Sequence, residues 1–256
     1  MCGICFSRRS FLALGAAAGL AACTDNAETG RSQFVLVSDD QLTGMADQAW
    51  AQVTAEIPRV RDPAAHERLA RIGRPLAAAS GRGDLDWEFV VLDSPEFNAF
   101  VLPNGKVGFF RGLLEFARSD DEVGSVLGHE VGHIIARHPA ERVSQELAVQ
   151  AGVSLAQILL SNGEDGGQFA GEIAAALGMG AMFGVLLPYS RKHELEADRV
   201  GVGLMREAGL DPTAAVTFWE RMIARQARQP KPLEALSTHP ADERRLSELK
   251  AVVQAA

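Results

Sequence analysis

Two histidines four residues apart, with a glutamate directly after the first, are the side chains in this sequence best suited to chemistry. The stretch reads His129-Glu130-Val131-Gly132-His133. On a helix, a spacing of four puts both imidazoles on one face, where they can hold one metal ion. Glu130 would then lie beside the ion and could take a proton from a water bound there. Zinc suits such a site because it accepts nitrogen and oxygen ligands and an open fourth position.

A third ligand has to come from another part of the chain. Glu194 and Asp198 are also four residues apart, in a helical pattern that begins near Ser190. If that helix packs against the first, Glu194 can complete a site of two histidines and one carboxylate. Asp198 could accept the second ring N–H of a ligand histidine and fix its tautomer. A solvated, charged helix face has the same pattern, so spacing alone leaves both interpretations open.

The elements that would position these residues are mostly helices. Ser119 followed three residues later by Glu122 is typical of a capping box at the start of the histidine helix, and Pro139 marks its expected end. A strand is predicted over 87–92, and two more over 98–102 and 106–110 flank a Pro-Asn-Gly turn. Asp-Pro pairs at 62–63 and 211–212 predict two further helix starts. The pattern predicts an α+β fold, mainly α, with a small β-sheet or hairpin before the metal-binding helix.

The N-terminal residues 1–22 have the features of an export signal. Arg8 and Arg9 precede a short apolar run over 11–22, which resembles a twin-arginine signal peptide. The run ends in Leu-Ala-Ala-Cys23, which is similar to the lipobox of bacterial lipoproteins, although an ordinary signal with a chance cysteine is the alternative. We therefore predict a signal peptide over 1–22, a lipidated tether over 23–38 and one domain over 39–256. Thr24 after the cysteine favours the outer membrane, and the inner membrane remains possible.

Composition and cysteine usage narrow the kinds of binding partner and metal ligand that the protein can have. The formal net charge is −8, without runs of Lys or Arg, which argues against a nucleic-acid partner and against a polybasic membrane contact. The three cysteines are Cys2, Cys5 and Cys23, so cleavage before Cys23 would leave one, occupied by the lipid. No disulfide and no thiolate ligand would remain. The uncharged run over 173–187 is predicted to be a pair of buried helices, with a transmembrane or membrane-resting segment as alternatives.

Several motifs occur together in the order of one known family. The His129–His133 motif, the Ser-Arg pair at 190–191, the Glu-Leu-Glu-Ala-Asp run at 194–198 and the Asn-Ala-Phe strand before the Pro-Asn-Gly turn resemble the forty-eighth metallopeptidase family, the HtpX/CAAX-prenyl-endopeptidase zinc peptidases. The resemblance covers roughly residues 40 to 250. The chain differs from the integral-membrane members, whose long transmembrane helices are not seen here, and in size and lipobox it is nearest to LoiP-like lipoproteins, with BepA-like members of the cell envelope also similar.

The resemblance implies roles for particular residues. In a gluzincin of this family, His129, His133 and Glu194 would bind one zinc ion, Glu130 would be the general base and Asp198 would support a ligand. The strand edge formed by Asn98, Ala99 and Phe100 would bind an extended substrate by strand addition.

His239 and the other histidines need separate interpretation. His239 precedes Pro240 in a segment similar to one in BepA-like members, so it could be a regulatory fourth ligand or merely a residue at a helix start. Candidates for stabilising an oxyanion are Tyr189, His193 and His239. His66 and His138 lack partners at a useful spacing and are predicted to be surface or helix-end residues.

The sequence thus predicts a zinc-dependent metalloendopeptidase of the bacterial cell envelope, lipid-anchored and facing the periplasm. Its expected partners are misfolded or misassembled envelope proteins as substrates, the membrane through its lipid, and possible envelope assembly or protease complexes. The alternative is a lipoprotein chaperone or assembly factor with a structural or gated zinc site. Glu130 discriminates between them, because a structural site needs no general base.

Overall fold

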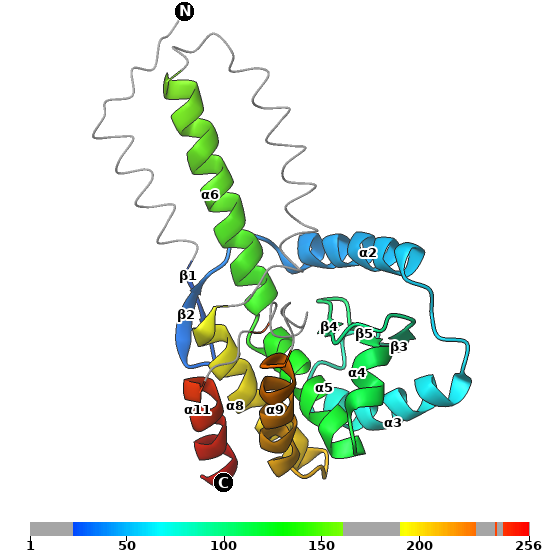
Figure 1. Cartoon of the computed structure of the whole chain (residues 1–256). Helices are drawn as coiled ribbons and strands as arrows, with labels where there is room; N and C mark the ends of the chain where they lie inside the picture. The colour runs from blue at the N-terminus through cyan, green and yellow to red at the C-terminus, as the bar shows by residue number, and fades with distance from the viewer. Residues whose placement is uncertain (1–22, 161–189, 229–238, 240–242, 256) are drawn as a thin grey trace, which may run out of the picture.

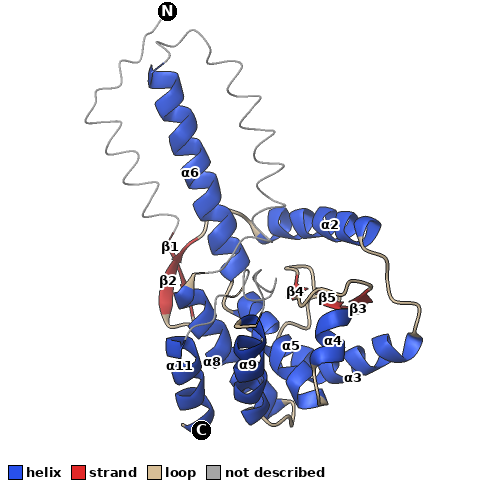
Figure 2. Cartoon of the chain, viewed as in Figure 1, coloured by secondary structure: helices blue, strands red, loops and turns tan. Residues whose placement is uncertain are grey.

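The computed structural model describes residues 23–160, 190–228, 239 and 243–255. Helices make up most of this part, and a small sheet lies beside them (Figures 1 and 2). The fold prediction of a mainly helical α+β protein with its sheet before the histidine helix is therefore confirmed. The elements are β1 (Cys23–Asn26), β2 (Arg31–Phe34), α2 (Asp39–Glu56), α3 (Pro63–Ala79), β3 (Glu88–Leu92), β4 (Ala99–Val101), β5 (Lys106–Phe110), α4 (Arg111–Phe116), α5 (Asp120–Ile135), α6 (His138–Leu160), α8 (Arg191–Glu207), α9 (Thr213–Gln226) and α11 (Glu243–Gln254).

The three-stranded sheet has the order β3-β5-β4. β4 and β5 form the predicted antiparallel hairpin, and β3 pairs with β5 in parallel. Gly105 in the turn has φ of 85°, a left-handed conformation that glycine adopts without steric cost. Because β5 lies in the centre, β4 is an edge strand, as the strand-addition hypothesis for Asn98, Ala99 and Phe100 requires.

Helix starts follow the predicted capping residues. Asp62 caps α3 by accepting a hydrogen bond from the Ala64 N–H, and Pro63 is the first helical residue. Ser119 caps α5 by accepting from the Glu122 N–H. The carboxylate of Glu122 accepts from the backbone N–H of Arg118 and pairs with Arg221, so only the serine half of the predicted capping box was found.

The helix α5 runs through the centre of the fold, and most of its residues are buried. Its apolar side chains pack with α3, the sheet and α9 in the main core, whose members include Leu69, Ile72, Phe109, Val123, Leu127, Val131 and Phe218. Burial on several sides fixes the rotation of α5 about its axis. The core covers the other sides of α5, so His129 and His133 lie on the remaining side, which faces α8.

Glycines allow α5 and α8 to approach closely. A Cβ built on Gly132 would lie 2.7 Å from the carbonyl oxygen of Ala197, and one on Gly201 would lie 2.9 Å from the Gly128 carbonyl. Real Cβ atoms essentially never show contacts this short. The absence of side chains at these positions therefore lets the backbones of the two helices touch, which brings the acidic residues of α8 to the histidines of α5.

The residues expected to be a tether are folded. β1 and β2 form an antiparallel hairpin over residues 23–34, and the side chain of Gln33 donates to the carbonyl oxygen of Ala136 at 2.6 Å. Asn26 donates to the carbonyl of Ile135 at 3.3 Å. The C-terminal carbonyl groups of a helix lack intrahelical partners, and the hairpin satisfies two at the end of α5. Residues 23–34 of the predicted tether thus cap the central helix, and the lipidation and the domain boundaries stay predictions.

Other predictions concern residues outside the described ranges. These are the signal peptide over 1–22, the uncharged run over 173–187 and Tyr189. Among the helices that the structure describes, none combines the length and the apolar character needed to cross a membrane.

Candidate metal centre

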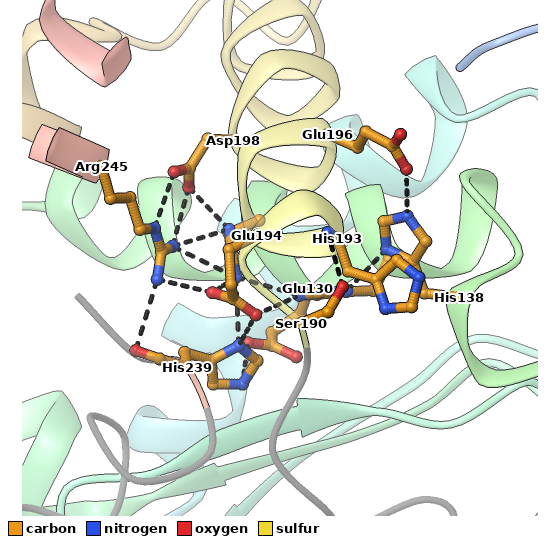
Figure 3. Close-up of polar contacts among 11 residues, drawn as sticks. Glu130, His138, Ser190, His193, Glu194, Glu196, Asp198, His239 and Arg245 are labelled. Carbon is orange, nitrogen blue, oxygen red and sulfur yellow. Dashed lines mark hydrogen bonds and ion pairs between the residues drawn. The ribbon is translucent and has the colours of Figure 1, made fainter. Parts of the chain in front are cut away.

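Four side chains from three parts of the chain converge on one point. His129 and His133 come from α5, Glu194 comes from the first turn of α8, and His239 precedes α11. Each offers one ligand atom, and these atoms lie within 4.8 Å of one another in a fully buried group. Figure 3 shows Glu194 and His239 facing each other below α8. The structure thus brings together all four predicted ligand positions.

Four of the separations between the donor atoms fit a tetrahedral ion. Nε2 of His129 lies 3.1 Å from Nε2 of His133 and 3.2 Å from Nδ1 of His239. Oε1 of Glu194 lies 3.5 Å from Nε2 of His133 and 3.2 Å from Nδ1 of His239. Ligand atoms at about 2.0–2.1 Å from a tetrahedral zinc are roughly 3.3–3.4 Å apart. Three imidazoles and a carboxylate without a thiolate form a donor set that suits zinc.

Asp198 holds the far side of His129. Its Oδ1 lies 2.8 Å from Nδ1 of His129, so the ring can donate its Nδ1–H there and keep the lone pair of Nε2 for a metal. Arg245 of α11 grips the same carboxylate through Nε at 2.8 Å and Nη2 at 2.9 Å, and pairs with Glu194. Its guanidinium lies over the ring of Trp219 at 4.5 Å. This arrangement favours the support role for Asp198 over the exposed helix face.

Electrostatics set the protonation of the ligands. Burial lowers the pKa of His129, but hydrogen bonds to Asp198 and Glu194 outweigh it and raise that pKa to about 9. Burial also lowers the pKa of His133, and here it dominates, leaving the pKa well below the ordinary value. Burial would raise the pKa of Glu194, yet the charges of His239 and Arg245 hold it well below its usual range. Glu194 is therefore an anionic donor at neutral pH.

Glu130 lies beside the four donors rather than among them. Its Oε1 is 3.3 Å from Nε2 of His239, and the side chain is buried. Burial raises the pKa of its carboxyl, against the charges of His239 and His129. A carboxylate with a raised pKa beside a metal site is a good proton acceptor and a good donor in the next step.

His138 does not lie at the surface. It begins α6, but it is 0% exposed, and its Nδ1 lies 2.9 Å from Nδ1 of His133. Its Nε2 lies 2.9 Å from Oε2 of Glu196. Burial is the largest cause that lowers the pKa of His138, to about 4, so the ring is neutral at pH 7. The prediction that His138 lacks a useful partner is wrong, because α5 ends before Arg137, whose φ is 54°, and the first residue of α6 places its ring against His133.

Two other histidines are placed by the structure. His193 is buried on the same side of α8 as His138, with Nε2 3.1 Å from Glu141, so it is not one of the four converging donors (Figure 3). His66 is half-buried, with Nε2 2.8 Å from the carbonyl of Val60 and Nδ1 accepting from the N–H of Val91. His66 therefore links α3 to β3 instead of lying free at the surface.

Sequence reasoning missed Arg245 and Arg31 as contributors to this region. Arg245 is buried against Asp198, and Arg31 of β2 pairs with Glu141 and Glu196. Both are distant in sequence from the carboxylates that they contact, so no local spacing could identify them. The only available signal was the three acids at 194, 196 and 198, which require cations if that part of the helix is buried.

Comparisons with known proteins agree with this geometry. The sequence model of "Peptidase family M48" matches residues 63–253. The chain is 38% identical to mitochondrial metalloendopeptidase OMA1 of Schizosaccharomyces pombe over 87% of its length, and 31% identical to the mitochondrial OMA1 metalloendopeptidase of Homo sapiens over 88%. It is 30% identical to the beta-barrel assembly-enhancing protease of Yersinia pestis over 87%. The chain spans 64%, 45% and 46%, respectively, of these relatives. The resemblance is confirmed at the level of the family: the chain belongs to peptidase family M48.

Proposed function

We propose that the protein is a zinc-dependent endopeptidase in which His129, His133 and Glu194 bind the metal and Glu130 is the general base. The convergence of the donor atoms at tetrahedral spacing supports this function most directly. A buried carboxylate next to that group, with a raised pKa, has no purpose in a structural zinc site. The family membership and the names of the relatives, which are metalloendopeptidases and a protease, support the same class.

The proposed mechanism assigns a separate task to each side chain. Bound zinc would acidify water and polarise the scissile carbonyl group. Glu130 accepts a proton from the attacking water and transfers it to the nitrogen of the leaving amine. Asp198 holds the Nδ1–H of His129, so the ring keeps one tautomer throughout. Arg245 keeps Asp198 and Glu194 anionic in their buried positions.

His239 fits the regulatory role proposed for it. Its Nδ1 occupies the fourth corner of the donor group, 3.2 Å from both His129 and Glu194. A site with four protein ligands is closed, whereas catalysis needs one position for water and substrate. We expect His239→Ala to raise the rate of proteolysis of the purified protein. Unchanged or lower activity with unchanged zinc content would contradict the gating role.

The substrate class and the location are further parts of the proposal. Unfolded or misassembled envelope proteins would bind as an extended strand along β4, whose outer edge is not paired with any strand that the structure describes. The Arg8-Arg9 pair and the Leu-Ala-Ala-Cys23 box support export and lipidation. Mass spectrometry of the membrane-extracted protein should find an acylated Cys23. A Cys23→Ser variant that remains in the membrane fraction would contradict the anchor.

The deciding experiment compares purified residues 24–256 with the Glu130→Gln variant. Bound zinc and cleavage of casein, an unfolded protein, are measured for both. Glu115→Gln is the matched control, because Glu115 is an exposed glutamate of α4. We expect all three proteins to bind one zinc, and only Glu130→Gln to lose cleavage. A parent that binds zinc but does not cleave, even with His239→Ala added, would favour the chaperone alternative, and a parent without zinc would refute the metal site.

A further inference from the structure

Three acidic residues in the first half of α8, Glu194, Glu196 and Asp198, face two different flanks of the helix. Figure 3 shows Asp198 and Glu194 toward Arg245 on one side, and Glu196 toward His138 on the other. Asp198 and Glu194 are one helical turn apart and share a face, whereas Glu196 lies between them in sequence and points elsewhere. Glu196 is nevertheless buried, as are the two others. A buried carboxylate away from the donor group needs a reason to be there, because burial of an unpaired charge is costly.

A line of polar contacts runs from His133 to that carboxylate. Nε2 of His133 faces the donor group, so its remaining nitrogen, Nδ1, faces away and lies 2.9 Å from Nδ1 of His138. Nε2 of His138 lies 2.9 Å from Oε2 of Glu196. A neutral His133 that binds a cation through Nε2 carries its proton on Nδ1 and donates it to His138. His138 then carries its own proton on Nε2 and donates it to Glu196.

Arg31 of the N-terminal hairpin completes this line. Its Nε lies 2.7 Å from Oε1 of Glu196, and its Nη2 lies 3.0 Å from Oε2. The same guanidinium donates through Nη1 and Nη2 to Glu141 at 2.9 and 2.6 Å. The side chain of Arg31 is 15% exposed, and those of both glutamates are 9% exposed. Planar, bidentate pairing of this kind fixes the carboxylate in one orientation.

The other histidine of α5 has an equivalent support. His129 contacts Asp198, and Asp198 is gripped by Arg245 of α11. Each histidine of the motif is thus backed by a carboxylate of α8 and an arginine, which His129 reaches directly and His133 reaches through His138. The arginine behind His129 comes from the C-terminal end of the described chain, and the arginine behind His133 comes from the hairpin at its beginning.

We propose that Arg31 is a positioning residue of the metal site, which fixes the tautomer and orientation of His133 through Glu196 and His138. The N-terminal hairpin is therefore part of the metal centre, and a domain that begins at residue 39 is incomplete. The inference rests on the proposed zinc site, but it concerns the affinity for the metal and requires no proteolysis. Loss of such outer contacts typically weakens metal binding by about 10–100-fold.

The test uses Arg31→Ala in purified residues 24–256. The zinc dissociation constant is measured by competition with a chromophoric chelator, and the visible spectrum of the Co²⁺-substituted protein reports the ligand geometry. Asn26→Ala is the matched control, because Asn26 docks the same hairpin on the carbonyl of Ile135 without touching Glu196. Circular dichroism and thermal unfolding check that each variant is folded.

We expect Arg31→Ala to bind zinc roughly tenfold more weakly, with a shifted Co²⁺ spectrum, and Asn26→Ala to bind like the parent. Zinc affinity within twofold of the parent in folded Arg31→Ala would overturn the proposal. Equal losses in Arg31→Ala and Asn26→Ala would also overturn it, since hairpin docking alone would explain them. If Arg31→Ala does not fold, the zinc dissociation constant and the Co²⁺ spectrum of Glu196→Gln decide the proposal instead. A parent that binds zinc but does not cleave, even with His239→Ala added, would refute the peptidase and leave this result intact.

Discussion

The contact between α5 and α8 gives a prediction whose size follows from the structure. In Gly132→Ala, the new Cβ would lie 2.7 Å from the carbonyl oxygen of Ala197, 3.2 Å from its Cα and 3.3 Å from its carbonyl carbon. Ordinary contact begins at 3.4 Å, so the nearest pair must separate by 0.7 Å. All three atoms belong to the backbone of α8 and cannot rotate away. The helix that carries Glu194 must therefore shift relative to the helix that carries His129 and His133.

A shift of this size matters more for the metal than for the fold. Overpacking costs about 1–3 kcal/mol, and alanine gains back up to about 1 kcal/mol over glycine within a helix. We therefore expect Gly132→Ala to lose about 1–2 kcal/mol of unfolding free energy. Metal–ligand distances tolerate only about 0.2 Å, so we expect zinc affinity to fall by roughly 10–100-fold.

Gly203→Ala, on the facing helix α8, is the matched control. A Cβ there meets nothing within 4 Å, so this variant should gain up to about 1 kcal/mol and bind zinc like the parent. Urea unfolding gives the stabilities, and competition with a chelator gives the zinc dissociation constants. If Gly132→Ala matches the parent in both quantities, close backbone approach does not position the ligands, and the reasoning is refuted.

Other properties of the site lead to further predictions. His129 has a pKa raised to about 9, so below that pH zinc must displace about one proton to bind. The zinc dissociation constant should therefore fall roughly tenfold for each unit by which the pH rises between about pH 6 and 8. Calorimetry in two buffers of different ionisation enthalpy measures the released proton, and no release would contradict the protonated state. Arg245→Met should lower the unfolding free energy by about 3–5 kcal/mol, since it leaves the carboxylates of Asp198 and Glu194 buried without their cation; equal urea midpoints would argue against this role. Removal of zinc by a chelator should lower the melting temperature of the parent and of Glu130→Gln alike, because Glu130 does not bind the metal. A lower melting temperature in only one of the two proteins would contradict this role for Glu130.

Local spacing determined much of what could be predicted. The positions of His129 and His133 on one helix face follow from the 3.6-residue period, and so does the shared face of Glu194 and Asp198. The caps at Ser119 and Asp62 and the turn before Lys106 depend on side chains within a few residues of the backbone groups that they satisfy. These features need no knowledge of the rest of the chain, so the sequence alone was sufficient for them.

Only the tertiary structure decided which residues support the ligands. His138 is five residues after His133, and on a continuous helix the two rings would point about 140° apart. The helix is instead interrupted at Arg137, whose φ is 54°, and the two rings lie together. Arg31 and Arg245 lie 165 and 47 residues from the carboxylates that they grip. Long-range ion pairs depend on how helices and the hairpin pack around the buried charge, and no local pattern encodes that packing.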